Sequence, residues 1–236
     1  MTKTDTRGTG LPALLWILGG IGWLTGEAVT AAAYPRYGYA TNYISDLGVP
    51  EVGSFQGRAI DSPLHAVMNT TFIGHGILFG LAGVLVAFLV RSASRRVRVT
   101  VGVLAVLHFV GILLVGLFHG SEASVESGAI VLHVSGAAVA ILSGNVLAIV
   151  AGAGSSALRA PRAYRVVSVV LGIVGIVSLV MLLVDSSSSV VDVFPDGVWE
   201  RASVYTIVAW ELMTGVTLAV SSLRGRRTAN PTAARG

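Results

Sequence analysis

The chain has 236 residues, of which 53% are hydrophobic and only 12% are charged. A water-soluble domain of this length could not bury so much apolar surface, so the composition predicts an integral membrane protein. There is no cysteine, which excludes disulfides, thiolate metal sites and cysteine nucleophiles. The formal net charge of +4 comes from basic residues spread over several short loops, a pattern that argues against a nucleic-acid partner.

Six apolar stretches are long enough to cross a bilayer core of about 30 Å. They are expected at residues 11–33, 64–90, 99–118, 128–152, 164–184 and 199–223, within one transmembrane domain spanning 11–223. The first stretch is longer than the core of a usual signal peptide, so we interpret it as a retained helix. The sequence therefore predicts an all-α, polytopic membrane protein in which six transmembrane helices form one bundle.

Polar segments flank and connect these stretches. Residues 1–10 form a tail, residues 224–236 form a basic tail, and the loop 34–63 is the one long polar connection. The two tails and the loops after the second and fourth stretches carry 13 of the 16 basic residues. Because cytoplasmic loops retain lysine and arginine, both termini are expected in the cytoplasm and the loop 34–63 outside, in a multi-pass protein of the plasma membrane.

Polar and ionisable residues gather at two depths, which for the helical residues follow from a rise of about 1.5 Å per residue. Near the outer interface we expect Ser45, Asp46, His65, His119, Glu200 and Arg201, with His133 slightly deeper. Nearer the bilayer centre we expect His75, His108 and Glu211, with Glu27 somewhat shallower. A charged side chain at the centre costs at least about 2.5 kcal/mol, so these residues should face the bundle interior and find partners there.

This arrangement admits several chemistries. His65, His119 and His133, with Asp46, are enough ligands for a catalytic zinc, although no closely spaced histidine pair supports them. Alternatively, His75 or His65 opposite His133 could hold a haem iron, although no haem-attachment motif is present. Ser45 with a histidine and Asp46 could form a nucleophilic site, although adjacent Ser and Asp side chains do not easily adopt triad geometry.

The same residues also have structural interpretations. Ser45 and Asp46 can cap a short helix or a turn. Glu200 and Arg201 can form an interfacial ion pair at the start of the sixth helix. Asn69 can hydrogen-bond across two helices.

Short motifs along the chain resemble a known family. They are Asn42 to Gly48 after the first helix, Pro63 with Asn69, Leu117-Phe118, His133 with Gly136-Ala137, and Gly197 with Glu200, Arg201 and Tyr205. As a set they resemble the bacterial and archaeal six-helix membrane family called domain of unknown function nine-nine-eight. Similar proteins tend to follow the third helix with Phe-Pro and an acidic residue, where this chain has His119-Gly120-Ser121-Glu122. The resemblance implies a fold and a choice of site residues, but no reaction.

The leading hypothesis is an outward-facing polar pocket that binds a lipid headgroup or a small molecule, with metal-assisted hydrolysis as an extension. Asp46 and His133 would be the acid–base or ligand pair, and Arg201 the anion contact. Ser45, His65, Asn69 and Glu200 would complete the pocket. A structural membrane subunit without enzymatic activity and a haem electron-transfer protein are the alternatives. The sequence leaves open whether the protein is an enzyme, its ligand, its cofactor and its oligomeric state.

Overall fold

The computed structural model describes residues 8–154, 160–187 and 193–227, and most of them are helical. The six long helices are α1 (Gly10–Ala33), α2 (His65–Leu89), α3 (Arg95–Leu117), α5 (Ile130–Gly154), α6 (Arg162–Ser187) and α7 (Asp196–Arg227). Each of the six is long and apolar enough to cross a membrane, so the predicted fold class is confirmed. The outermost parts of the two predicted tails, 1–7 and 228–236, lie outside the described residues.

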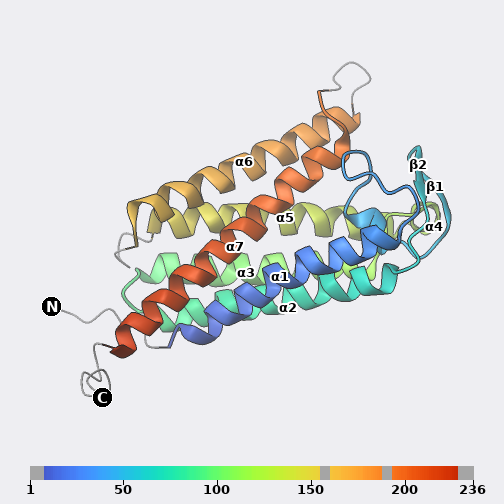
Figure 1. The fold of residues 1–236 in the computed structure, drawn as a ribbon. Coiled ribbons are helices and arrows are strands. Elements are labelled where there is room, and N and C mark those ends of the chain that lie inside the picture. Colours follow the sequence, from blue (N-terminus) through green and yellow to red (C-terminus); the bar gives the residue numbers. More distant parts are fainter. Residues whose placement is uncertain (1–7, 155–159, 188–192, 228–236) are drawn as a thin grey trace.

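The long helices form a ring in chain order. Each packs against the next, and α7 returns to pack against α1, while α5 also contacts α7 (Figure 1). Helix α1 begins and α7 ends at the same end of the bundle, which we call the terminal end. The connection between α1 and α2 lies at the opposite end, which we call the loop end. Any polar group inside the ring is therefore surrounded by helices rather than by lipid.

Local sequence explains where several helices begin and end. The Ser94 hydroxyl accepts a hydrogen bond from the amide of Val97 and caps α3, so this helix begins at Arg95 rather than at Val99 as expected. The short helix α4 (Glu122–Ser127) is capped in the same way by Ser121. It ends at Gly128, whose φ of 78° is a left-handed conformation that glycine adopts without strain.

The loop-end connection contains regular structure, including a hairpin that the sequence analysis did not expect. A 3-10 helix, η1 (Ser45–Gly48), is followed by a hairpin of β1 (Gly53–Phe55) and β2 (Arg58–Ile60). The two strands are antiparallel, with Gly53 opposite Ile60. Strands of three residues are too short to show an alternating pattern in the sequence, so this hairpin gave no signal.

Two apolar clusters fill the ring. Toward the terminal end, Trp16, Phe79 and Trp210 pack mostly edge to face with centroid distances of 5.4 to 6.2 Å. Toward the loop end, the cluster contains Trp23 and Phe72 together with Ile44 and Leu47 from the loop. Because Ile44 and Leu47 are almost fully buried, the loop is packed into the bundle and closes its end.

Candidate functional site

Asp46 is the centre of the loop's polar contacts. It is 2% exposed, and its two carboxylate oxygens accept hydrogen bonds from Arg58 at 2.8 and 3.2 Å. The amide of Tyr43 and the side-chain amide of Asn42 donate to it as well, at 3.0 and 3.2 Å. A two-point arginine–carboxylate bond is strong and fixes geometry, so it ties η1 to the hairpin. Both oxygens of Asp46 are therefore occupied within the chain.

Tyr43 joins the loop to the start of α7. Its hydroxyl donates to the Asp196 carboxylate at 2.8 Å, and the Arg58 guanidinium lies 4.0 Å from its ring centroid. Burial raises the pKa of Tyr43, and its bond to Asp196 raises that pKa further. The phenol therefore stays protonated at physiological pH and acts as a hydrogen-bond donor.

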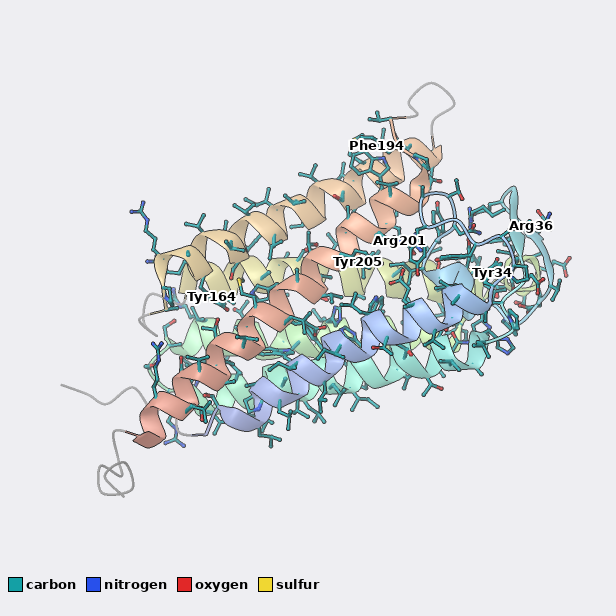
Figure 2. All side chains as sticks on the ribbon, in the orientation of Figure 1. Tyr34, Arg36, Tyr164, Phe194, Arg201 and Tyr205 are labelled. Atoms are coloured by element: carbon teal, nitrogen blue, oxygen red, sulfur yellow. The ribbon has the colours of Figure 1, made fainter. Side chains whose placement is uncertain are left out.

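Arg201 provides a second connection between α7 and the loop (Figure 2). Its Nε donates to Glu27 of α1 at 3.2 Å, and its Nη1 donates to the carbonyl oxygens of Tyr39 and Asn42 at 2.6 and 2.7 Å. Its Nη2 donates to the hydroxyl of Tyr37. All three guanidinium nitrogens of Arg201 thus donate to groups within the chain, and its predicted role as an anion contact stays a prediction.

The backbone of the loop lies directly against α7. A Cβ atom at Gly197 would lie 2.5 Å from the carbonyl oxygen of Asn42 and 2.7 Å from that of Ala40. Only glycine allows this close approach.

The alternative of an ion pair between Glu200 and Arg201 is not what the structure shows, because Arg201 pairs with Glu27. Successive residues of a helix point about 100° apart, so Arg201 and Glu200 face different neighbours.

A small cavity lies beneath η1, inside the ring of helices. Its volume is about 40 Å³, and its polar lining comes from Ser45 and Glu200. Its apolar lining comes from five helices: Trp23, Phe72, Ile112, Val115, Ala137, Ala140, Ile141 and Val204, with Ile44 of the loop. The Ile44 amide donates to Oε2 of Glu200, which holds the carboxylate in place. Among the described residues, neither Oε1 of Glu200 nor the Ser45 hydroxyl has a hydrogen-bond partner.

The three candidate metal ligands make separate contacts near the hairpin. The Nδ1 atoms of His65 and His133 lie 3.0 and 2.7 Å from the carbonyl oxygens of Ser62 and Phe118. Such bonds leave Nε2 of each ring available, as in many metal-binding histidines. Nevertheless, no group of three or more His, Asp or Glu side chains that could hold a metal occurs in the described part of the chain. The predicted zinc site therefore gains no support from the geometry.

Asn69 links the loop to His119. Its side-chain amide donates to the carbonyl oxygen of Gly48 at 2.8 Å and lies 3.1 Å from Nε2 of His119. This is the structural interpretation of Asn69, because the amide ties α2 to the loop. The predicted acid–base pair of Asp46 and His133 stays a prediction: each makes its own contacts, and no hydrogen bond joins the two among the described residues.

We expect His119 to make the fold sensitive to acid. Burial lowers the pKa of His119 and nearby His65 lowers it further, against the opposing charge of Glu51. As the pH falls, the unfolded chain therefore takes up the proton before the folded protein does. His119 contributes its full stability above its unfolded pKa of about 6.5. That contribution is lost as the pH falls toward the lower pKa of the folded state. Melting temperatures in detergent at pH 7.5 and 5.5 measure this loss. His119→Gln should show a smaller loss than the wild type, and an equal loss would contradict the assignment.

The three histidine and glutamate side chains predicted near the bilayer centre, His75, His108 and Glu211, lie close together inside the ring. Nε2 of His75 lies 3.1 and 3.2 Å from the two carboxylate oxygens of Glu211, and both side chains are almost fully buried. The His108 ring packs against that of His75 with a centroid distance of 5.4 Å, and its Nδ1 lies 2.9 Å from the carbonyl oxygen of Ala140. Because His75 is bonded to Glu211 and enclosed by rings, the geometry gives the haem hypothesis no support.

A comparison with protein-family profiles identifies the family of the chain. The profile of the family described as "Protein of unknown function (DUF998)" matches residues 17–217. The chain belongs to the DUF998 family. No curated protein and no solved structure matches it. The resemblance predicted from short motifs is therefore confirmed.

The motifs that carry the resemblance to DUF998 proteins converge at the loop end. The segment Asn42–Gly48 contacts Gly197, Glu200 and Arg201, and the Tyr205 hydroxyl donates to Glu27 at 2.9 Å beside Arg201. Asn69 holds Gly48, the last residue of the first motif. Segments far apart in the sequence thus form one polar network around the end of the ring.

Sequence reasoning missed two members of this DUF998 network. Arg58, in the middle of the loop, gave no signal of its own, yet it is the ionic partner of Asp46. Glu27 was expected to be somewhat shallower than the deeper layer, but the sequence did not indicate its partners, Arg201 and Tyr205. The excess of carboxylates over cations near the outer interface was the available signal, because buried carboxylates need cationic partners.

Proposed function

We propose that this DUF998 membrane protein binds the positively charged end of a small molecule or lipid headgroup in the cavity beneath η1. The observation that carries the proposal is the lining of that cavity, where the Glu200 carboxylate and the Ser45 hydroxyl are the polar groups in an otherwise apolar wall. Ligand pockets commonly combine an apolar wall with a few placed polar groups that fix orientation. The proposal keeps the predicted headgroup site and changes the expected charge of its ligand.

The charges near the cavity favour a cation. Arg58 and Arg201 are each paired, with Asp46 and Glu27. Among the described residues, Glu200 has no cationic partner within salt-bridge distance. The rings of Trp23 and Phe72 line the same cavity, and aromatic faces attract ammonium groups. An ammonium group would thus meet a carboxylate, a hydroxyl and two aromatic rings.

The volume of the cavity limits what can enter. One water molecule needs roughly 10–15 Å³ of such space, so about 40 Å³ accommodates an amine or ammonium group rather than a whole headgroup. The remainder of the ligand would lie outside the cavity. We further propose that the protein resides in the plasma membrane with both termini in the cytoplasm, so that the loop end and the cavity beneath it lie toward the outside.

Ligand-induced stabilisation tests the proposal. In purified wild-type protein, ethanolamine should raise the melting temperature, whereas sodium phosphate at the same ionic strength should not. Glu200→Gln keeps the acceptor for the Ile44 amide but removes the charge, so the shift produced by ethanolamine should fall to less than half. Ser45→Ala should have a smaller effect in the same direction.

Glu126→Gln is the matched control, because Glu126 is an exposed carboxylate at the same end of the bundle. It should respond to ethanolamine as the wild type does. Stabilisation by phosphate alone, or an unchanged response in Glu200→Gln, would contradict the proposal. An absent response in all proteins would favour the alternative of a structural membrane subunit, which the contacts of Asp46 and Arg201 within the chain also suit.

A further inference from the structure

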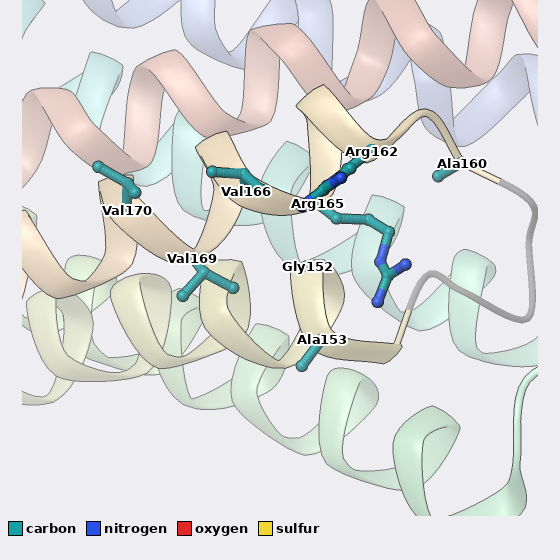
Figure 3. Close-up of a pocket in the computed structure, with 8 residues that line it drawn as sticks. All are labelled: Gly152, Ala153, Ala160, Arg162, Arg165, Val166, Val169 and Val170. Atoms are coloured by element: carbon teal, nitrogen blue, oxygen red, sulfur yellow. The ribbon is translucent and has the colours of Figure 1, made fainter.

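A second hollow lies at the terminal end, far from the cavity beneath η1. It is a groove of about 480 Å³ between the end of α5 and the start of α6 (Figure 3). Gly152 and Ala153 of α5 form one side, and Arg162 and Arg165 begin the other. Further along α6 the lining is apolar, from Val166, Val169 and Val170. The groove therefore has a basic end and an apolar end.

Its position determines which molecules reach it. Both α5 and α6 are long enough to span the membrane, and Val166 and Val170 are half exposed, so their side chains face the lipid. The arginines mark the level at which α6 leaves the apolar layer. A molecule in the groove would thus place a polar part beside the arginines and an apolar part along the valines.

The charge of the occupant follows from Arg165. Its Nε is buried and has no hydrogen-bond partner among the described residues. Buried polar groups are usually hydrogen-bonded, so this atom indicates an acceptor that the described residues do not supply. Arginine binds phosphate through two parallel hydrogen bonds, and anionic phospholipids present phosphate to basic residues at the membrane surface.

A similar groove between α2 and α3 also contains arginines, but one of them is already bonded within the protein. It is lined by Arg95 and Arg98 and has a volume of about 610 Å³. There, Nε of Arg98 donates to the carbonyl oxygen of Ala87 at 2.6 Å. The guanidinium of Arg98 is thus partly committed to the protein, whereas that of Arg165 retains an unused buried donor.

We infer that the groove between α5 and α6 is a binding site for an anionic phospholipid. The phosphate lies at Arg162 and Arg165, and one acyl chain follows Val166, Val169 and Val170. Basic pockets between transmembrane helices are known to bind anionic lipid headgroups. This site is independent of the cavity beneath η1 and of the cation proposed to bind there.

Competition between two lipids tests the inference. The purified protein is incubated with equal amounts of phosphatidylglycerol and phosphatidylcholine with identical acyl chains, and retained lipids are counted by native mass spectrometry. The wild type should retain phosphatidylglycerol in preference. The double variant Arg162→Gln and Arg165→Gln should lower the ratio of the two retained lipids by about tenfold, because each arginine near the membrane surface contributes attraction to anionic lipid.

The matched control removes two exposed arginines outside both grooves at the same end, Arg91→Gln with Arg96→Gln. This control should keep the wild-type ratio. Val166→Trp fills the groove without changing charge and should reduce the retention of phosphatidylglycerol in a protein that keeps both arginines. Equal losses in the groove and control variants, no preference in the wild type, or full retention in Val166→Trp would each overturn the inference.

Discussion

Replacing Arg201 by alanine is expected to destabilise the folded protein by about 3–5 kcal/mol. The substitution leaves Glu27, which is 2% exposed, without its cationic partner. It also removes the donor to the carbonyl oxygens of Tyr39 and Asn42, so the loop loses a connection to α7. A buried charge without a partner carries its full desolvation cost, which is why the loss exceeds that of a surface ion pair.

Reversible unfolding in mixed micelles, followed by circular dichroism, measures this loss. Arg36→Ala is the control, because Arg36 is an exposed arginine of the same loop, and it should change stability by less than about 0.5 kcal/mol. The double variant Glu27→Gln and Arg201→Met should be more stable than Arg201→Ala, since it leaves no buried charge. A loss below about 1 kcal/mol in Arg201→Ala would show that the network contributes little to folding.

His75→Leu is expected to produce the second large effect, a destabilisation of roughly 3 kcal/mol or more. Glu211 is fully buried between helices, and His75 is its hydrogen-bond partner. Without His75, the carboxylate must either remain unpaired in a low-dielectric interior or take up a proton. Both outcomes cost free energy in the folded state alone.

The double variant His75→Leu and Glu211→Leu separates the charge from the packing. It removes both polar groups, so its stability should recover toward that of the wild type. Thr70→Leu places the same residue at a lipid-facing position of α2 and should be nearly neutral. If the double variant is as unstable as His75→Leu, the cost comes from packing at position 75, and the polar pair is not the cause.

Prediction from sequence succeeded where the physical cause is local. Apolar stretches of sufficient length predicted the six helices, because only a helix satisfies its own backbone across a hydrocarbon layer. The short motifs from Asn42 to Tyr205 predicted the family. Prediction failed where a residue's partner depends on another helix: Arg201 bonds to Glu27 rather than to its neighbour Glu200.

In the candidate site, too, some features were predictable from the sequence and others depended on tertiary packing. The position of Glu200 near the start of a long helix was predictable from its place in the chain. The common position of Ser45 and Glu200 in one cavity was not, because it requires η1 to be packed over five helices. The hairpin that brings Arg58 to Asp46 was likewise decided by the packed loop.

The sequence by itself therefore determined the number of long apolar helices and their order, because hydrophobicity acts along the chain. The tertiary structure alone decided which polar groups meet. Ring closure between α1 and α7 brought Glu27 to Arg201, and the burial of His75 and Glu211 inside that ring gave each of them its partner. The physical reason is that the partner of a buried charge is set by the direction in which each helix presents it, and that direction is fixed only when the helices pack.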